Sequence, residues 1–141
     1  MRCTLGLTAA LLAVLSLTAQ AAPLSEQTIA GMRKAFEQYP EKFPAEVQRA
    51  FMAQRVVPGM DPYTAHMAGG AFIYRVVADP LKWPSGSDPF RVMWAQSMHP
   101  DHSKIWMTFE NDTQFAGEGK QRFIVVVEEG KVVRVEKIQA R

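Results

Sequence analysis

The hydrophobic period of this chain changes once, at the glycine pair Gly69-Gly70, and that change limits the folds open to it. Before the pair, apolar residues recur every three or four positions, which is the spacing of an amphipathic helix. After the pair they alternate and are mostly β-branched or aromatic, which is typical of strands. Helices followed by strands predict an α+β domain, with the helices packed on one face of an antiparallel sheet.

Two to three helices are expected before the change of period. The first runs from Ser25, a favourable N-cap, to about Tyr39, where a proline ends it. The second begins near Pro44, because proline suits the first turn of a helix. A third, short helix is capped by Asp61 and stops at the glycine pair.

The second part of the chain predicts a sheet of four to five strands. The expected strands are residues 72–77, 91–97, 104–110, 122–128 and 131–138. Residues 79–89 contain three prolines and are expected to form a loop.

Pairing by hydrophobic face predicts the strand register. Placing Ser97 opposite Lys104 gives one apolar face and leaves Trp106 and Met93 on the other face. The last hairpin is expected to turn at residues 129–130, with residue 128 opposite 131, 126 opposite 133 and 124 opposite 135.

The N-terminus predicts export. Arg2 precedes an apolar stretch at residues 5–17, and Ala19-Gln20-Ala21 supplies the small residues of a cleavage site. Cleavage near Ala21 would leave residues 22–141 as a single periplasmic or secreted domain. The only cysteine, Cys3, would be removed with residues 1–21, so no disulfide or cysteine metal ligand is expected.

The overall charge points away from nucleic acid. The chain of 141 residues has 16 basic and 14 acidic residues, a net charge of +2, and 48% of it is hydrophobic. This near-neutral balance lacks the basic footprint of nucleic-acid-binding domains. The apolar N-terminal stretch is too short for a stable membrane span, so the chain is not expected to cross a membrane.

The segment around the change of period resembles one known family. A helix is followed by Val57, Gly59 and Met60, and then by a short helix from Asp61 that ends at glycine and leads into the first strand. This order is similar to that in the small BamE/SmpA-OmlA-like proteins. The resemblance implies a two-layer fold and a periplasmic or outer-membrane-associated domain that binds proteins or lipid surfaces. Family members are typically lipoproteins, whereas this chain has no cysteine placed to accept a lipid.

Three residues are candidate partner contacts. Trp106 and Met93 fall on the polar face of the predicted sheet, and tryptophan is enriched at binding hot spots. Trp83 lies in the proline-rich loop, where it either contacts a partner or folds back as the hydrophobic plug of the loop. We therefore expect a non-enzymatic binding domain that contacts a protein or cell-envelope component through its sheet face and this loop. No catalytic motif is present.

The alternative function is binding of a small ligand or metal at the turn after residue 97. Met98, His99, Asp101 and His102 lie within five positions, and thioether and imidazole groups suit copper or zinc. Outside that site no cofactor is expected. Asn111-Asp112-Thr113 also fits the N-glycosylation pattern of eukaryotic secretory proteins.

Overall fold

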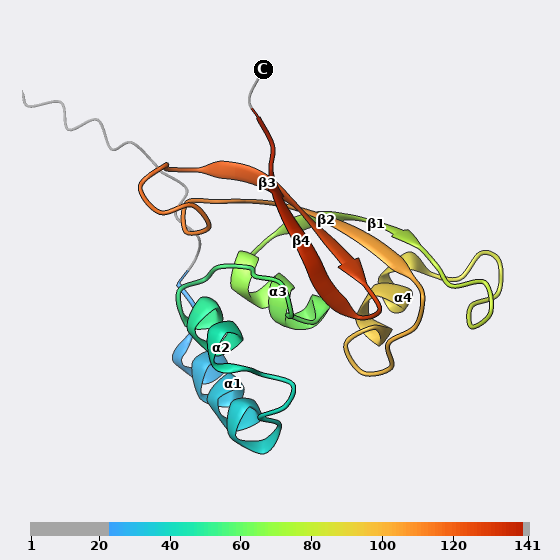
Figure 1. The fold of residues 1–141 in the computed structure, drawn as a ribbon, viewed down its shortest axis with the longest axis horizontal. Helices are drawn as coiled ribbons and strands as arrows, with labels where there is room; N and C mark the ends of the chain where they lie inside the picture. The colour runs from blue at the N-terminus through green and yellow to red at the C-terminus, as the bar shows by residue number, and fades with distance from the viewer. Residues whose placement is uncertain (1–22, 140–141) are drawn as a thin grey trace, which may run out of the picture.

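The computed structural model describes residues 23–139, which form four helices on one side of a four-stranded antiparallel sheet (Figure 1). The helices are α1 (Glu26–Gln38), α2 (Ala45–Met52), α3 (Pro62–Gly69) and α4 (Pro89–Ala95). The strands are β1 (Phe72–Val77), β2 (Lys104–Asn111), β3 (Gln121–Glu128) and β4 (Lys131–Lys137), in that order across the sheet. The α+β prediction is confirmed. The predicted signal peptide lies outside the described residues.

Helices α1 and α3 begin where their predicted caps place them, and α2 begins directly after Pro44. Ser25 Oγ accepts a hydrogen bond from Thr28 N at the start of α1, and Met32 and Phe36 form its buried stripe. Asp61 caps α3 in the same way, with its Oδ1 2.9 Å from Thr64 N. Each cap satisfies a backbone N–H that the helix itself leaves unpaired.

The glycine pair ends α3 for two different reasons. Gly70 has a φ of 90°, a conformation that side chains other than glycine rarely adopt. At Gly69, a Cβ atom would lie 2.6 Å from Cδ1 of Phe109, so the helix can approach the sheet only without a side chain there. The break in hydrophobic period therefore marks the point where the helical layer meets the sheet.

The predicted strand at residues 91–97 is wrong: this segment belongs to α4. Asp88 caps the helix by accepting from Phe90 N at 3.0 Å, and Pro89 is its first residue. Val92 and Met93 are neighbours and both are 0% exposed, which a helix in a core allows but a half-buried strand does not. A short apolar run fits the hydrophobic period of a strand as well as that of a helix, so periodicity alone does not separate the two here. The predicted pairing of residues 91–97 with β2 is lost with it.

The sheet has a continuous apolar face. Tyr74 lies opposite Met107, Met107 lies opposite Val125, and Val125 lies opposite Val135. Residues directly opposite one another in a sheet point to the same side, and these point toward the helices. The core therefore lies between this face and the helices, and all four helices contribute side chains to it.

The β3–β4 hairpin turns at Glu129 and Gly130, which have φ values of 51° and 74°. Two positive φ values form the tight turn that two-residue hairpins prefer. Glu128 lies opposite Lys131, as predicted, but a bulge next to Val126 then shifts the register by one residue. The predicted pairs 126–133 and 124–135 are wrong for this reason, since a bulge inserts an extra residue in one strand.

Candidate functional site

Six aromatic side chains form a connected cluster on the side of β1 that faces the helices. They come from α3, β1 and α4, and are Tyr63, His66, Phe72, Tyr74, Phe90 and Trp94. Neighbouring ring centroids are 4.7 Å apart at the closest pair, His66–Phe72, and 5.9 Å apart at the widest, Tyr74–Phe90. Tyr63 and Phe90 are exposed, and the other four side chains are partly buried, three of them against the core. The cluster is therefore an aromatic layer between core and surface, held together by edge-on and tilted ring contacts.

An apolar cleft of about 360 Å³ adjoins this cluster where α1, α3 and α4 meet. Its apolar walls are Met32, Tyr39, Phe43, Tyr63, Trp94 and Met98. Tyr39 is 56% exposed, Tyr63 46% and Met98 72%, so the cleft opens to solvent along its rim. These large apolar side chains are gathered in one place, which distinguishes the cleft from the scattered apolar residues that any surface carries.

The polar groups of the cleft are used within the protein. Lys42 Nζ donates to Ser97 O at 2.8 Å and lies 3.8 Å from Asp61 Oδ2. Asp61 in turn accepts from the backbone and hydroxyl of Thr64. These contacts join the α1–α2 loop to the start of α3 and the end of α4. They leave the cleft with one balanced charge pair and mostly apolar walls.

Two buried polar atoms near the cleft, His66 Nδ1 and Trp94 Nε1, have no hydrogen-bond partner within residues 23–139. The two rings meet edge to face, with centroids 5.4 Å apart. Burial lowers the pKa of His66, which favours the neutral form of its imidazole. A neutral histidine keeps the aromatic cluster free of charge.

Trp106 alternates along β2 with the buried Ile105 and Met107, so it lies on the sheet face that points away from the helices, where it is partly exposed. The Arg75 guanidinium on the neighbouring strand lies 4.2 Å from its ring centre. This is a cation–π distance, so the ring and the cation cover each other. Met93, which was predicted beside Trp106, is instead buried on α4 and contacts no solvent.

Trp83 is half-buried and folds back onto the body of the protein. Its Nε1 donates to Asp101 Oδ2 at 2.8 Å. Nearby, Asp79 accepts from Leu81 N and from His102 N, and its own N–H donates to the Ser103 hydroxyl. The 79–88 loop is therefore tied to the 98–103 turn by two buried aspartates.

The four predicted metal ligands make separate contacts in the structure. Asp101 is buried and accepts from Ser103 N and Trp83 Nε1. Burial opposes its ionisation, but hydrogen bonds from Ser103, Gln96 and Trp83 prevail and lower its pKa to about 2. His99 and Met98 are exposed, and Met98 lines the cleft.

His102, the fourth predicted ligand, has its Nδ1 3.2 Å from Glu129 Oε1. Among the described residues, no group of three His, Cys, Asp or Glu side chains is close enough to hold a metal ion. No helix in the same part of the chain is long and apolar enough to cross a membrane.

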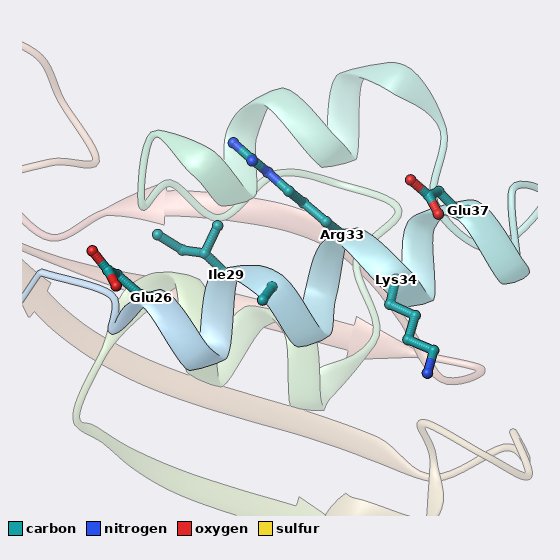
Figure 2. A pocket seen from close by; sticks show the side chains of 6 residues that line it. Glu26, Ile29, Arg33, Lys34 and Glu37 are labelled. Atoms are coloured by element: carbon teal, nitrogen blue, oxygen red, sulfur yellow. The ribbon is translucent and has the colours of Figure 1, made fainter.

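A second hollow, of about 420 Å³, runs along the outer side of α1 (Figure 2). Its lining includes Ile29 and four charged side chains spread along the one helix, Glu26, Arg33, Lys34 and Glu37. The charges balance, and the hollow is the groove between ordinary surface side chains. It is not a built site of the kind formed where α1, α3 and α4 meet.

The sequence pattern did not indicate the buried amides that position the helices. Asn111 Nδ2 donates to Gly69 O at 3.0 Å, and Gln114 makes two hydrogen bonds to the backbone of Val56. Asn111 is only 2% exposed, so the glycosylation pattern that includes it is inside the fold. The sequence pattern did not indicate the cleft either, because its walls come from separate helices with no shared motif.

Comparison with known proteins found no match: no family model, no curated protein and no solved structure is similar to this chain.

Proposed function

We propose that this chain is an exported, non-enzymatic binding domain whose cleft between α1, α3 and α4 receives apolar side chains of a partner protein. The observation that carries the proposal is the exposed rim of Tyr39, Tyr63 and Met98 around an apolar cleft, next to the aromatic cluster. Solvent-exposed aromatic and methionine side chains gathered in one patch mark interaction sites. Tyrosine, tryptophan and methionine are also the residues enriched at protein interfaces.

The size and shape of the cleft favour a protein partner over a lipid chain. A volume of about 360 Å³ is at the small end of ligand sites and is suited to one or two large side chains. The cleft is open along its rim, whereas an acyl chain gains most from an enclosed apolar channel. Tyrosine hydroxyls at this rim can also hydrogen-bond to a partner's backbone.

The polar groups support recognition by contact. Lys42, Asp61 and Thr64 already bond to one another or to the backbone, so the cleft offers an apolar surface with a fixed polar edge. A partner side chain would be held mainly by burial, at about 25 cal/mol per Å² of apolar area removed from water. This differs from the sheet-face surface expected from the sequence, since Met93 is internal and the Arg75 guanidinium lies over the partly exposed Trp106 ring.

The proposal is tested by placing a photo-crosslinking residue, p-benzoylphenylalanine, at position 98 of the full chain in its source cells. Leu81 is the matched control position, because it is 89% exposed but lies outside the cleft. We expect a discrete protein adduct from position 98 and none of the same mass from position 81. Adding Tyr63→Ala should reduce the adduct from position 98 at least several-fold.

Two outcomes would overturn the proposal. Equal adducts from both positions, or an adduct insensitive to Tyr63→Ala, would show that the cleft is not the contact surface. An adduct whose mass is that of a lipid would show that the occupant is not a protein. Tyr63 is half-exposed, so its loss should leave the fold intact, which circular dichroism checks.

A further inference from the structure

Strand β1 forms one edge of the sheet, and its outer edge has no partner among residues 23–139 (Figure 1). It pairs only with β2, and no other described backbone group bonds to it. An edge strand of this kind exposes a row of unpaired N–H and C=O groups, which is a template for another strand.

The opposite edge of the sheet is protected, and β1 is not. On β4, Val132 exchanges backbone hydrogen bonds with the segment at Gly59 and Met60, at 2.8 and 2.7 Å. The rest of β4 carries a bulge and four charged residues, Lys131, Arg134, Glu136 and Lys137. These are the usual devices that stop edge-to-edge pairing. The β1 sequence, FIYRVV, has no proline and a single charge.

Both faces of β1 carry apolar side chains that a further strand would cover. Ile73 is 77% exposed and Val77 is 55% exposed on the face away from the helices. On the helix side, Phe72, Tyr74 and Val76 are only half-buried. No residue of β1 is fully buried, although its six residues are nearly all β-branched or aromatic.

We propose that β1 pairs antiparallel with β1 of a second copy of this chain, about a two-fold axis, to join two four-stranded sheets into one. Closed two-fold dimers are the commonest oligomers, and they require a surface that is complementary to itself. A six-residue strand with one arginine meets that requirement only in a register that keeps the two arginines apart.

The side-chain pattern selects such a register. Opposite residues in a sheet share a face, so each helix-side residue must meet a helix-side residue of the second copy. With Tyr74 opposite Tyr74, Phe72 meets Val76 and Ile73 meets Arg75. The next register along would place Arg75 opposite Arg75, and directly opposed like charges are destabilising. Arg75 needs no acidic partner in the favoured register, because its guanidinium lies over Trp106.

The helix-side surface continues across such a pairing. Phe90 of α4 is 46% exposed and contacts Tyr74, with centroids 5.9 Å apart. In the dimer this ring would lie beside the partner strand and extend the apolar layer. Two six-residue strands and Phe90 bury less than a standard stable interface. The dimer should therefore be weak, in the micromolar range, and depend on protein concentration.

The test is sedimentation velocity of the chain without residues 1–21, over a concentration series from about 1 to 300 μM. We expect a shift from monomer to dimer across the series. Because Ile73 faces Arg75 in the proposed register, Ile73→Lys should weaken dimerisation at least tenfold. Ile73→Glu should leave it unchanged or tighten it. Val133→Lys, at a 46% exposed position on β4, is the control and should have no effect.

Each other result contradicts the proposal. A chain that stays monomeric at the highest concentration has no such interface, and a dimer insensitive to Ile73→Lys forms elsewhere. Equal weakening by Ile73→Lys and Ile73→Glu would refute the register. Ile73 is largely exposed, so both variants should fold, and unchanged thermal melting of the monomer checks this. The adduct expected from the cleft does not depend on the dimer, so the two proposals can fail separately.

Discussion

Gln114 is expected to contribute more to stability than any motif visible in the sequence. It is 5% exposed and forms hydrogen bonds with the segment between α2 and α3. Its Oε1 accepts from Val56 N at 2.7 Å, and its Nε2 donates to Val56 O at 2.8 Å. One side chain thereby satisfies both backbone groups of Val56, which is itself 1% exposed. We predict that Gln114→Met, which keeps the size of the side chain and removes only its hydrogen bonds, is strongly destabilising.

The magnitude follows from the two groups left behind. A buried backbone donor or acceptor without a partner costs about 1–3 kcal/mol, so losing both costs roughly 2–6 kcal/mol. A water that entered the site would recover part of this, which favours the lower half of the range. Domains of this size have about 5–15 kcal/mol of stability in all, so the effect should be large.

Urea denaturation of the chain without residues 1–21, followed by tryptophan fluorescence, measures the loss. We expect a lower midpoint at an unchanged slope, since the unfolded surface is the same. Gln121→Met is the matched control, because its Nε2 makes one exposed hydrogen bond to Glu118 O. It should change stability by less than about 0.5 kcal/mol. A similarly small loss for Gln114→Met would refute the reasoning.

The remaining predictions concern glycine, a titrating aspartate and the glycosylation pattern. Gly69→Ala should lower the free energy of unfolding by about 1–3 kcal/mol, because its Cβ would collide with the Phe109 ring. Gly31→Ala, in open space on α1, should raise it by about 0.5–1 kcal/mol in the same urea assay. The pKa of Asp101 is about 2 in the fold, below its usual value of about 3.9. Its contribution to the free energy of unfolding is therefore complete above about pH 3.9 and is lost as the pH falls toward about 2. Asp101→Asn should therefore flatten the loss of stability between about pH 5 and pH 2, and an unaltered pH profile would contradict this. Asn111 is buried, so the folded chain expressed in a eukaryotic secretory pathway should carry no glycan there by mass spectrometry, and an occupied site would show that this turn opens.

Local chemistry made the first three helices and the last turn predictable. Ser25 and Asp61 mark helix starts, because each side chain accepts a hydrogen bond from the backbone N–H three residues further on. The Glu129-Gly130 turn depends on two φ angles and no distant contact. Features of this kind are determined by neighbours in the sequence, so a sequence alone can reveal them.

The segment at α4 shows where local reasoning stops. Asp88 and Pro89 are a sound helix start, yet Val92 and Trp94 also alternate as in a strand. The choice is made by the core, where Val92 and Met93 are buried side by side. The change from strand to helix also alters the candidate site, because it takes Met93 out of the sheet and places Trp94 in the wall of the cleft.

The sequence by itself determined the α+β class, the caps, the tight turn and the point at which helices give way to strands, because each depends on periodicity or on groups a few residues apart. The tertiary structure alone decided which side chains form a surface. The cleft walls come from α1, α3 and α4, and the amides of Asn111 and Gln114 reach partners 42 and 58 residues away. Such contacts exist only once the chain has brought distant segments together. For that reason, the surface proposed for binding and the edge proposed for dimerisation could be recognised only from the fold.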